Sequence, residues 1–365
     1  PLLTQEVVDA RMREDKEAGL REYGNIFTSE GGDGQIIRRA DIIRNSVPRV
    51  PDLKNKDGAS KYIITYDPAR LADRSVVLVT EVYCDENVGW KARIVNVIQL
   101  ADVLTKRKTP MSTPNQIKAL KQIILDYNGE GNADYENILA ILVDSGSGGA
   151  GVPITDFLCE DWEDEKGVMH RGLIDSEFRP DEKMKTKFPN AIDGILHLIS
   201  PAKYKPDLFE ALIKMMQQNL IEFTEEYMHK GYLTLLYEKY PNGEMKQRYT
   251  YPSEKEEKEL KKKGITIENK IRHLERDEEL SLKLIDSMKT ELVNIYRFNQ
   301  SNGRDRFDLA PDKAGKLNDD KAYVCALMGW QLSNMRRENI TNRKLSYSDA
   351  TDFISKLTIR KAKYN

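Results

Sequence analysis

Residues 61–83, KYIITYDPARLADRSVVLVTEVY, contain two apolar strand patterns joined by a short polar turn. The first run ends on Asp67, and Asp73 lies in the turn before the second run. An ionised carboxylate at the end of a buried strand costs free energy unless it is paired or binds a cation. The stretch therefore predicts two antiparallel strands and a special role for Asp67.

The pattern continues in a way that predicts a mixed α/β sheet. A third β-rich run, WKARIVNVIQL, spans 90–100, and residues 113–128 have a helical pattern with Thr113 as N-cap and Pro114 at the first helical position. A fourth run, ENILAILVD at 136–144, is apolar on both faces and therefore interior. Three antiparallel strands, a helix and a parallel strand are expected.

The fourth run also ends on an acid, Asp144, followed by the glycine-rich DSGSGGAGVP. This stretch lacks both the GxxxxGK[ST] and the GxGxxG spacing of phosphate-binding loops, so the glycines predict a tight turn that a polyanion approaches closely. Ligands of open α/β sheets gather at the carboxyl ends of strands. Asp67 and Asp144 therefore converge if their strands are neighbours.

A third acidic site is the pair Asp319–Asp320, which opens an amphipathic helical pattern running through Leu332. Acids at this position favour the positive end of the helix dipole, and a lone Asp after a strand often caps a turn. Capping explains each acid taken singly. Together, the acids after the first and fourth strands and at the start of the late helix indicate a shared site.

Composition limits the class of protein. The chain has 365 residues, 39% of them hydrophobic and 32% charged, which fits one large domain with an insertion, or two domains. It has no apolar run long enough for a bilayer and no leader pattern, so a cytoplasmic protein is expected. A net charge of −2 requires that any nucleic-acid contact come from a local patch. The cysteines are expected in the core, without disulfides or zinc: Cys84, Cys159 and Cys325.

The order of three motifs, YDPARLADRS, ILVDSGSGGAG and NDDKAYVCALMGW, resembles the nuclease domain of the large terminase subunit of tailed double-stranded DNA bacteriophages. That family has a ribonuclease H-like fold related to Holliday-junction resolvases. GLREYGNIF resembles the segment that joins the family's ATPase motor to its nuclease. The match spans residues ~15–222 and ~290–335. It implies a ribonuclease H-like mixed sheet, three antiparallel strands and then parallel ones, flanked by helices.

The resemblance also implies a division of the chain. No Walker sequence is present, so no ATPase activity is expected from this chain. Asn318 stands where the family usually has His. The expected parts are a connector from a missing ATPase domain (1–60), the nuclease core (61–222), a charged insertion with helices and an Asn242-Gly243 type I′ hairpin (223–297), the rest of the core (298–340) and a tail (341–365).

The implied activity is that of a metal-dependent DNA endonuclease cutting concatemeric DNA. Clustered carboxylates are kept charged by divalent cations, and oxygen ligands suit two Mg²⁺ or Mn²⁺ ions. Asp67 is expected to bridge the ions, with Asp144 and Asp320 as flanking ligands. Asp319 is either a fourth ligand or orients the others, and Asp73 either reaches the site or caps the turn.

Candidate DNA contacts are Arg70 and Arg74 beside the first acid, Lys321, and Lys203 and Lys205 in a segment before a helix, where a solvated loop is the alternative. The implied partners are double-stranded DNA, the terminase ATPase domain and the small subunit or portal, in the host cytoplasm and not in the mature virion. Two alternatives stay open. One is a resolvase or transposase-like nuclease of the same fold, and the other is a non-catalytic docking module whose acids only cap turns.

Overall fold

The computed structural model describes residues 34–68, 75–102, 109–129, 134–146, 152–179, 182–299 and 305–344. Arg70, Asp73 and Arg74 lie outside these ranges, so their predicted roles stay predictions. None of the helices within these ranges is both long and apolar enough to cross a membrane.

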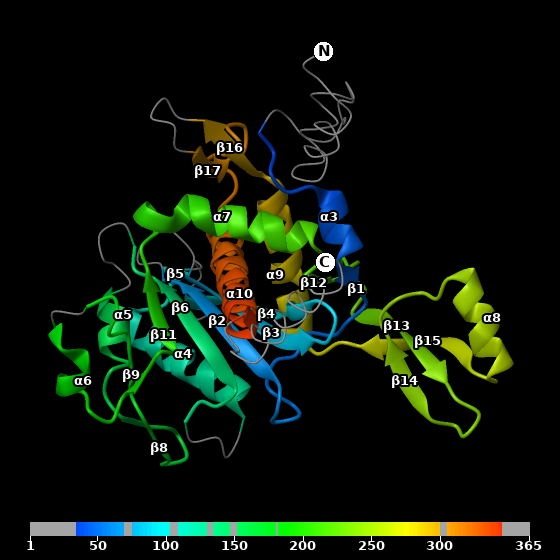
Figure 1. Cartoon of the computed structure of the whole chain (residues 1–365), viewed down its shortest axis with the longest axis horizontal. Coiled ribbons are helices and arrows are strands. Elements are labelled where there is room, and N and C mark those ends of the chain that lie inside the picture. The colour runs from blue at the N-terminus through cyan, green and yellow to red at the C-terminus, as the bar shows by residue number, and fades with distance from the viewer. Residues whose placement is uncertain are drawn as a thin grey trace, which may run out of the picture.

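A central sheet organises the fold (Figure 1). Its strand order is β1-β12-β4-β3-β2-β6-β11, with β5 paired to β4. Strands β2, β3 and β4 are antiparallel, β6 runs parallel to β2, and β11 runs parallel to β6. The bounds are β1 Ser46–Val47, β2 Lys61–Asp67, β3 Ser75–Asp85, β4 Gly89–Asp102, β5 Thr109–Pro110, β6 Ile138–Asp144, β11 Leu196–Ile199 and β12 Ile221–Thr224. This is the ribonuclease H-like arrangement, and the predicted fold class is confirmed.

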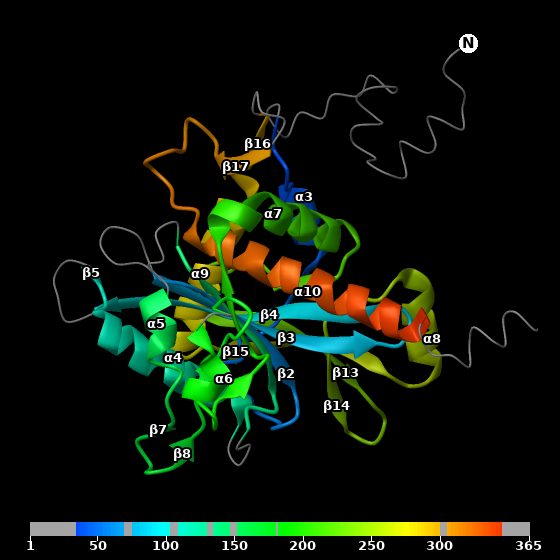
Figure 2. The ribbon, with the colours of Figure 1, turned by 60° about the vertical axis from the view of Figure 1, so that its left-hand side comes forward.

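Helices cover both faces of the sheet (Figure 2). Period-two alternation directs Ile64 and Val143 to one face, where they share a buried cluster with Leu120 of α4, Thr113–Asn128. Ile63 and Leu142 belong to the cluster on the other face. That face is covered by α7 Pro201–Gln217, α9 Arg276–Val293 and α10 Asp320–Lys344. Strands buried on both sides explain the continuous apolar runs of the sequence.

Two helices of the second face approach closely at Gly329. A Cβ built on Gly329 of α10 would lie 2.8 Å from the Cα of Leu212 in α7. No side chain fits there without moving backbone, so glycine lets α10 lie directly against α7.

A small three-stranded sheet lies beside the main sheet, within the expected insertion (Figure 1). Its order is β14-β13-β15, with α8 alongside, and its elements are β13 Tyr232–Lys239, β14 Met245–Arg248, α8 Glu254–Lys262 and β15 Thr266–His273. No residue of α8 is buried, as the mixed charges of the run predict.

Two segments outside the expected nuclease core pack with the main sheet. α9 falls within 223–297, yet its Ile285, Met288 and Leu292 are part of the main core. α3 Arg39–Arg44 and β1 fall within the expected connector, yet β1 pairs with β12 at the edge of the main sheet. The remaining elements are α5 Val152–Asp156, β7 Trp162–Glu163, β8 Met169–His170, β9 Leu173–Ile174, α6 Met184–Lys187, β10 Ile192–Asp193, β16 Ile295–Asn299 and β17 Asp305–Leu309.

Three local predictions were wrong. Ser112, not Thr113, occupies the N-cap of α4. Of the Asn242-Gly243 pair only Gly243 has a positive φ, +84°, and a type I′ turn needs positive φ at both central residues. Cys84 is exposed, whereas Cys159 and Cys325 are buried as predicted.

The start of α10 is fixed by Glu291 of α9. The Glu291 carboxylate accepts the backbone N–H groups of Lys321 (2.8 Å) and Ala322 (3.1 Å), and it also pairs with the Lys321 ammonium. The first N–H groups of a helix have no partner within the helix, so Glu291 supplies what a local cap would. Both side chains of the pair are almost completely buried.

We expect Glu291→Ala to lower the free energy of unfolding by roughly 3–5 kcal/mol, because it leaves the Lys321 charge buried and unpaired. Urea unfolding measures the change. The control is Lys261→Ala, which removes an exposed i,i+4 partner of Glu257 and should leave stability nearly unchanged. A Glu291→Ala variant as stable as this control would contradict the capping role.

Candidate active site

Asp67 and Asp144 end neighbouring strands. In the parallel pairing of β2 with β6, Tyr66 lies opposite Val143, so the next residue of each strand is one of the two acids. Asp144 in turn pairs with Ile199 of β11. The strand ends that the sequence predicted to converge therefore lie side by side at one edge of the sheet, the position where ligands of open α/β sheets bind.

Both acids belong to the sheet face that α10 covers. The Thr65 hydroxyl, two residues before Asp67, donates to the Val324 carbonyl of α10 at 2.9 Å. Leu142, two residues before Asp144, lies in the core cluster that contains most of the first turns of α10. Residues two apart on a strand point to the same face. Asp67 and Asp144 therefore share the face on which α10 begins.

The start of α10 provides the third acidic site. The Asp319 carbonyl accepts the N–H of Tyr323 at 2.8 Å, and the helix begins at Asp320. The Asp319 carboxylate lies 3.3 Å from the Lys205 ammonium of α7. Asn318 donates its side-chain amide to Asp320 at 3.2 Å. Asn318 thus contacts a candidate ligand.

Burial shifts the pKa of the Asp144 carboxyl. With 8% of its surface exposed, its pKa is raised to about 6 by burial, against the opposing effects of the Gly146 N–H and the Lys205 charge. The Gly146 N–H donates to the carboxylate at 2.6 Å. The Lys205 ammonium thus opposes the rise in the pKa of Asp144 and also pairs with Asp319. Its positive charge lies near one acid at a strand end and one acid at the start of the helix.

The Tyr323 hydroxyl is affected electrostatically by the same acids. Burial raises the pKa of the Tyr323 hydroxyl above its ordinary value, and the charges of Asp144, Asp67 and Asp319 raise it further. A phenol whose pKa is raised by the charges of all three carboxylates lies within electrostatic range of each. The predicted acids of the first strand, the fourth strand and the late helix therefore face one region of the fold, around Tyr323.

The donor set suits a hard divalent cation, because every candidate ligand is a carboxylate. Across the described ranges, no three His, Cys, Asp or Glu side chains are already grouped closely enough to hold a metal ion. The Lys205 ammonium beside Asp319 supplies positive charge in this arrangement. Asp67, Asp144, Asp319 and Asp320 are the carboxylates that the sequence predicted as ligands, and they lie at this end of the sheet.

The candidate DNA contacts divide into three groups. Lys203 and Lys205 lie in the first turns of α7 and not in a loop before it; Lys203 is exposed, with its ammonium 4.8 Å from the Tyr204 ring centroid. The prediction for Lys321 is wrong, because its side chain is buried and paired with Glu291. Arg70 and Arg74 lie outside the described residues, together with Asp73.

Two residues of this region were not singled out from the sequence, Tyr323 and Glu291. Tyr323 follows Asp319 and Asp320 by one helical turn, so helical periodicity could have placed it on their face. Glu291 carries no local signal, because it lies 30 residues before Lys321, the residue that it contacts.

No protein-family model and no curated protein matches the sequence. Among solved structures, the chain is similar to the large terminase nuclease from thermophilic phage G20c, at 12% identity and a TM-score of 0.36, covering 80% of this chain and 96% of that one. Structures of the same nuclease with bound magnesium and with bound cobalt align at 10% identity, with TM-scores of 0.39 and 0.38, covering 82% of this chain and 98% of each. With identities and TM-scores this low, the strand order and register of the chain itself carry the fold assignment.

Because burial raises its pKa, Asp144 should make stability depend on pH. Below about pH 4 the carboxyl is protonated in both the folded and the unfolded state; above pH 6 the folded state contains a buried ionised carboxylate. The resulting loss of stability develops between these pH values and amounts to at most ~3 kcal/mol. We therefore expect Asp144→Asn, measured by urea unfolding with chelator, to gain stability over the parent as the pH rises from 4 to 7.

Asp57→Asn provides a control of opposite sign. The N–H groups of Ser60 and Ala59 lower the pKa of Asp57, so this carboxylate stabilises the fold above its ordinary pKa and loses that effect as the pH falls. The Asp57 variant should therefore lose stability relative to the parent as the pH rises. A pH-independent difference for Asp144→Asn would contradict the assignment of a buried, destabilised carboxylate.

Proposed function

We propose that this chain is a metal-dependent DNA endonuclease that cuts concatemeric viral DNA during genome packaging. The observation that supports it most is the meeting of Asp67 and Asp144, on adjacent parallel strand ends, with the start of α10. Acids that only capped turns would not need to share one sheet face, one lysine and one buried tyrosine.

The residues have distinct roles in this proposal. Asp67 would be a ligand of both cations, Asp144 and Asp320 would each hold one of them, and Asp319 would be a fourth ligand or orient the others. When bound, two Mg²⁺ or Mn²⁺ ions supply an activated water and stabilise the leaving oxygen of the phosphodiester. Lys205 neutralises the carboxylate of Asp319, and exposed Lys203 contacts a DNA phosphate.

The packaging role is supported by the motif order in the sequence and by the ribonuclease H-like strand order. Double-stranded DNA is the substrate, and an ATPase motor delivers it, with the small terminase subunit or the portal as further partners in the host cytoplasm. A chain with a net charge of −2 has little bulk attraction for DNA, so delivery raises the local DNA concentration.

A non-catalytic docking module is the second candidate. It is favoured by the contacts of Asp319 with Lys205 and of Asp320 with Asn318, because both carboxylates already have protein partners. In a docking module these pairs would be permanent. In a nuclease they would give way to a cation.

We expect the chain to nick supercoiled plasmid with Mn²⁺ and not with chelator. Asp67→Asn and Asp144→Asn should each reduce the rate at least about 10³-fold, because bound metal supplies several kcal/mol of transition-state stabilisation. Asp57→Asn, an acid of an exposed turn, should cut like the parent. A parent chain that never nicks DNA, or an Asp144 variant that cuts at the parental rate, would favour the docking module.

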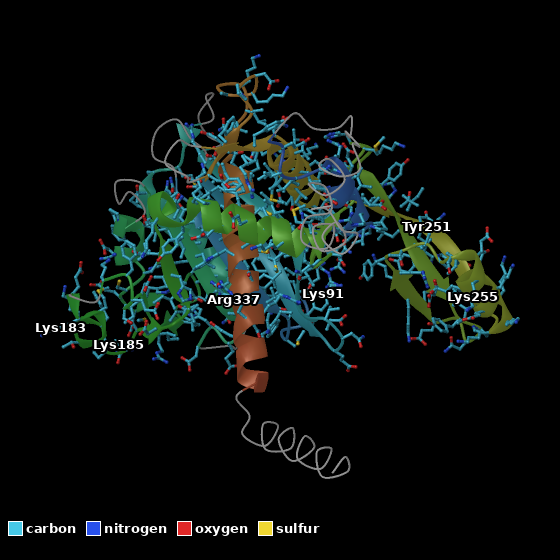
Figure 3. All side chains as sticks on the ribbon, turned by 45° about the horizontal axis from the view of Figure 1, so that its top comes forward. Lys91, Lys183, Lys185, Tyr251, Lys255 and Arg337 are labelled. Atoms are coloured by element: carbon cyan, nitrogen blue, oxygen red, sulfur yellow. The ribbon has the colours of Figure 1, made fainter. Side chains whose placement is uncertain are left out.

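We also expect weak, salt-sensitive binding to duplex DNA, in the non-specific range of about 10⁻⁴ to 10⁻⁶ M, because contact is mainly to phosphates. Fluorescence anisotropy with labelled duplex in Ca²⁺ measures binding. Lys203→Ala should weaken it and reduce its salt dependence. Lys255→Ala is the control. Lys255 is an exposed lysine of helix α8, which lies beside the small three-stranded sheet (Figure 3). Equal effects of the two variants would contradict a contact at α7.

A further inference from the structure

The Tyr323 hydroxyl is a buried donor without an acceptor. Tyr323 is 4% exposed, and its hydroxyl oxygen is shielded from solvent with no hydrogen-bond partner among the residues that the structure describes. Leaving a hydroxyl desolvated and unpaired costs free energy that a phenylalanine ring would avoid. A core that needed only the apolar ring has no use for this oxygen.

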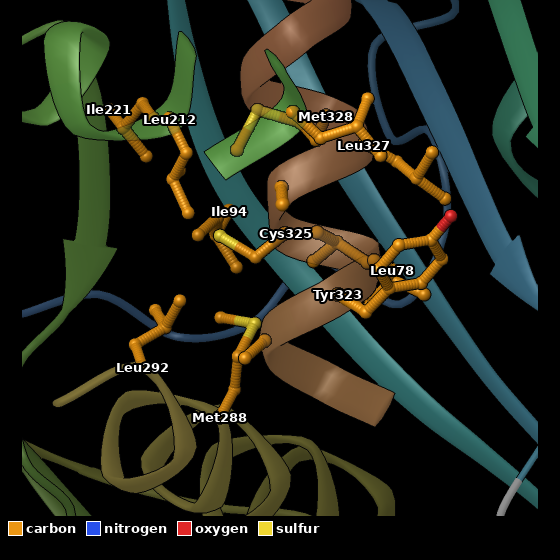
Figure 4. Close-up of a cluster of buried hydrophobic side chains, with 14 of the residues drawn as sticks. Leu78, Ile94, Leu212, Ile221, Met288, Leu292, Tyr323, Cys325, Leu327 and Met328 are labelled. Atoms are coloured by element: carbon orange, nitrogen blue, oxygen red, sulfur yellow. The ribbon is translucent and has the colours of Figure 1, made fainter. Parts of the chain in front are cut away.

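The position of the ring explains where a partner would lie. Tyr323 packs at the edge of the apolar cluster, with its oxygen on the side away from Met288 and Leu292 (Figure 4). The next residue, Val324, is held to β2 by the Thr65 hydroxyl, two residues before Asp67. The Tyr323 N–H is held by the Asp319 carbonyl. The ring is therefore fixed between the end of β2 and the start of α10, where the candidate acids lie.

We propose that Tyr323 is a positioning residue of the metal site, whose hydroxyl, unpaired among the residues that the structure describes, donates a hydrogen bond to a metal-binding carboxylate when a cation binds and so orients that carboxylate toward the cation. The inference rests on the proposed function, since it assigns a new residue to that site. Partners that orient ligands in this way typically affect metal affinity by 10–100-fold.

Electrostatics keeps the hydroxyl protonated, so it is able to donate. Burial and the negative charges of Asp144, Asp67 and Asp319 all oppose loss of its proton. Tyr323 is therefore a neutral O–H group in the chain alone. A neutral O–H donor buried among carboxylates can stabilise one of them in a fixed orientation.

The test compares Tyr323→Phe with the parent chain, using Mn²⁺ alone as the probe. Thermal unfolding is measured first with chelator and then over a Mn²⁺ titration, which gives the metal affinity without any need for cleavage. We expect the variant to unfold at the parental temperature or slightly above it with chelator, because the lost hydroxyl has no partner. Its Mn²⁺ affinity should be about 10–100-fold weaker.

Tyr127→Phe is the matched control. The Tyr127 hydroxyl is also buried, but it is paired, donating to the Asp52 carbonyl at 2.6 Å and accepting from Asn96 at 2.9 Å, on the α4 side of the sheet. Its loss should lower the unfolding temperature with chelator and leave the Mn²⁺ affinity unchanged.

Three results would count against a role for Tyr323 or for the site. A Tyr323 variant with parental Mn²⁺ affinity overturns the inference and leaves the proposed function intact. A variant that is destabilised like Tyr127→Phe, with its Mn²⁺ response unchanged, assigns the hydroxyl a structural role and also overturns it. A parent chain that Mn²⁺ does not stabilise contradicts the metal site itself.

Discussion

The candidate site depends on one buried interaction, the contact of Glu291 with the first turn of α10. The first turn of the helix packs against the core, and the N–H groups of its buried residues Lys321 and Ala322 cannot reach water. Glu291 satisfies two of them and neutralises Lys321 at the same point. Since Asp319, Asp320 and Tyr323 lie within one turn, their placement over the sheet follows from this capping.

Two further contacts set the direction of α10. Thr65 holds the Val324 carbonyl, and Gly329 lets the helix lie against α7. The first contact ties α10 to the strand that ends on Asp67, and the second ties it to the helix that carries Lys205. The acids come from three separate parts of the sequence, so these tertiary contacts, and no local motif, determine whether they meet.

The sequence predicted the elements that depend on local periodicity. Continuous apolar runs identified β2, β3, β4 and β6, and the acid at the end of β2 and of β6 identified the edge of the sheet where they converge. Predictions made from residue type were wrong where tertiary contacts override the usual preference of that residue. Lysine is seldom fully buried, yet Lys321 is, because Glu291 accompanies it. Asn-Gly suggested a tight hairpin, but the loop of residues 240–244 is longer than two residues.

Residues whose role comes only from their three-dimensional surroundings were beyond prediction. Glu291 resembles any other acid on a helix that alternates charged and apolar residues, and nothing in its neighbourhood in sequence indicates burial. The packing of α9 against the main sheet was beyond prediction for the same reason. The charged pattern of 223–297 suggested an insertion throughout, but the apolar stripe of α9 fills the core beneath the sheet.

Two features of the candidate site cost free energy in the chain alone. Asp144 is ionised at a cost, because burial raises its pKa, and the Tyr323 hydroxyl is desolvated without an acceptor. A cation that binds the folded state alone stabilises it by about 2.7 kcal/mol at a hundred times its dissociation constant. That is similar in size to the loss of stability that ionising Asp144 brings. Within the described residues, the buried acid and the unpaired hydroxyl lie at the same end of the sheet, so a cation in the proposed site would offset the cost of the ionised carboxylate, and a reoriented carboxylate would accept the hydrogen bond of the hydroxyl.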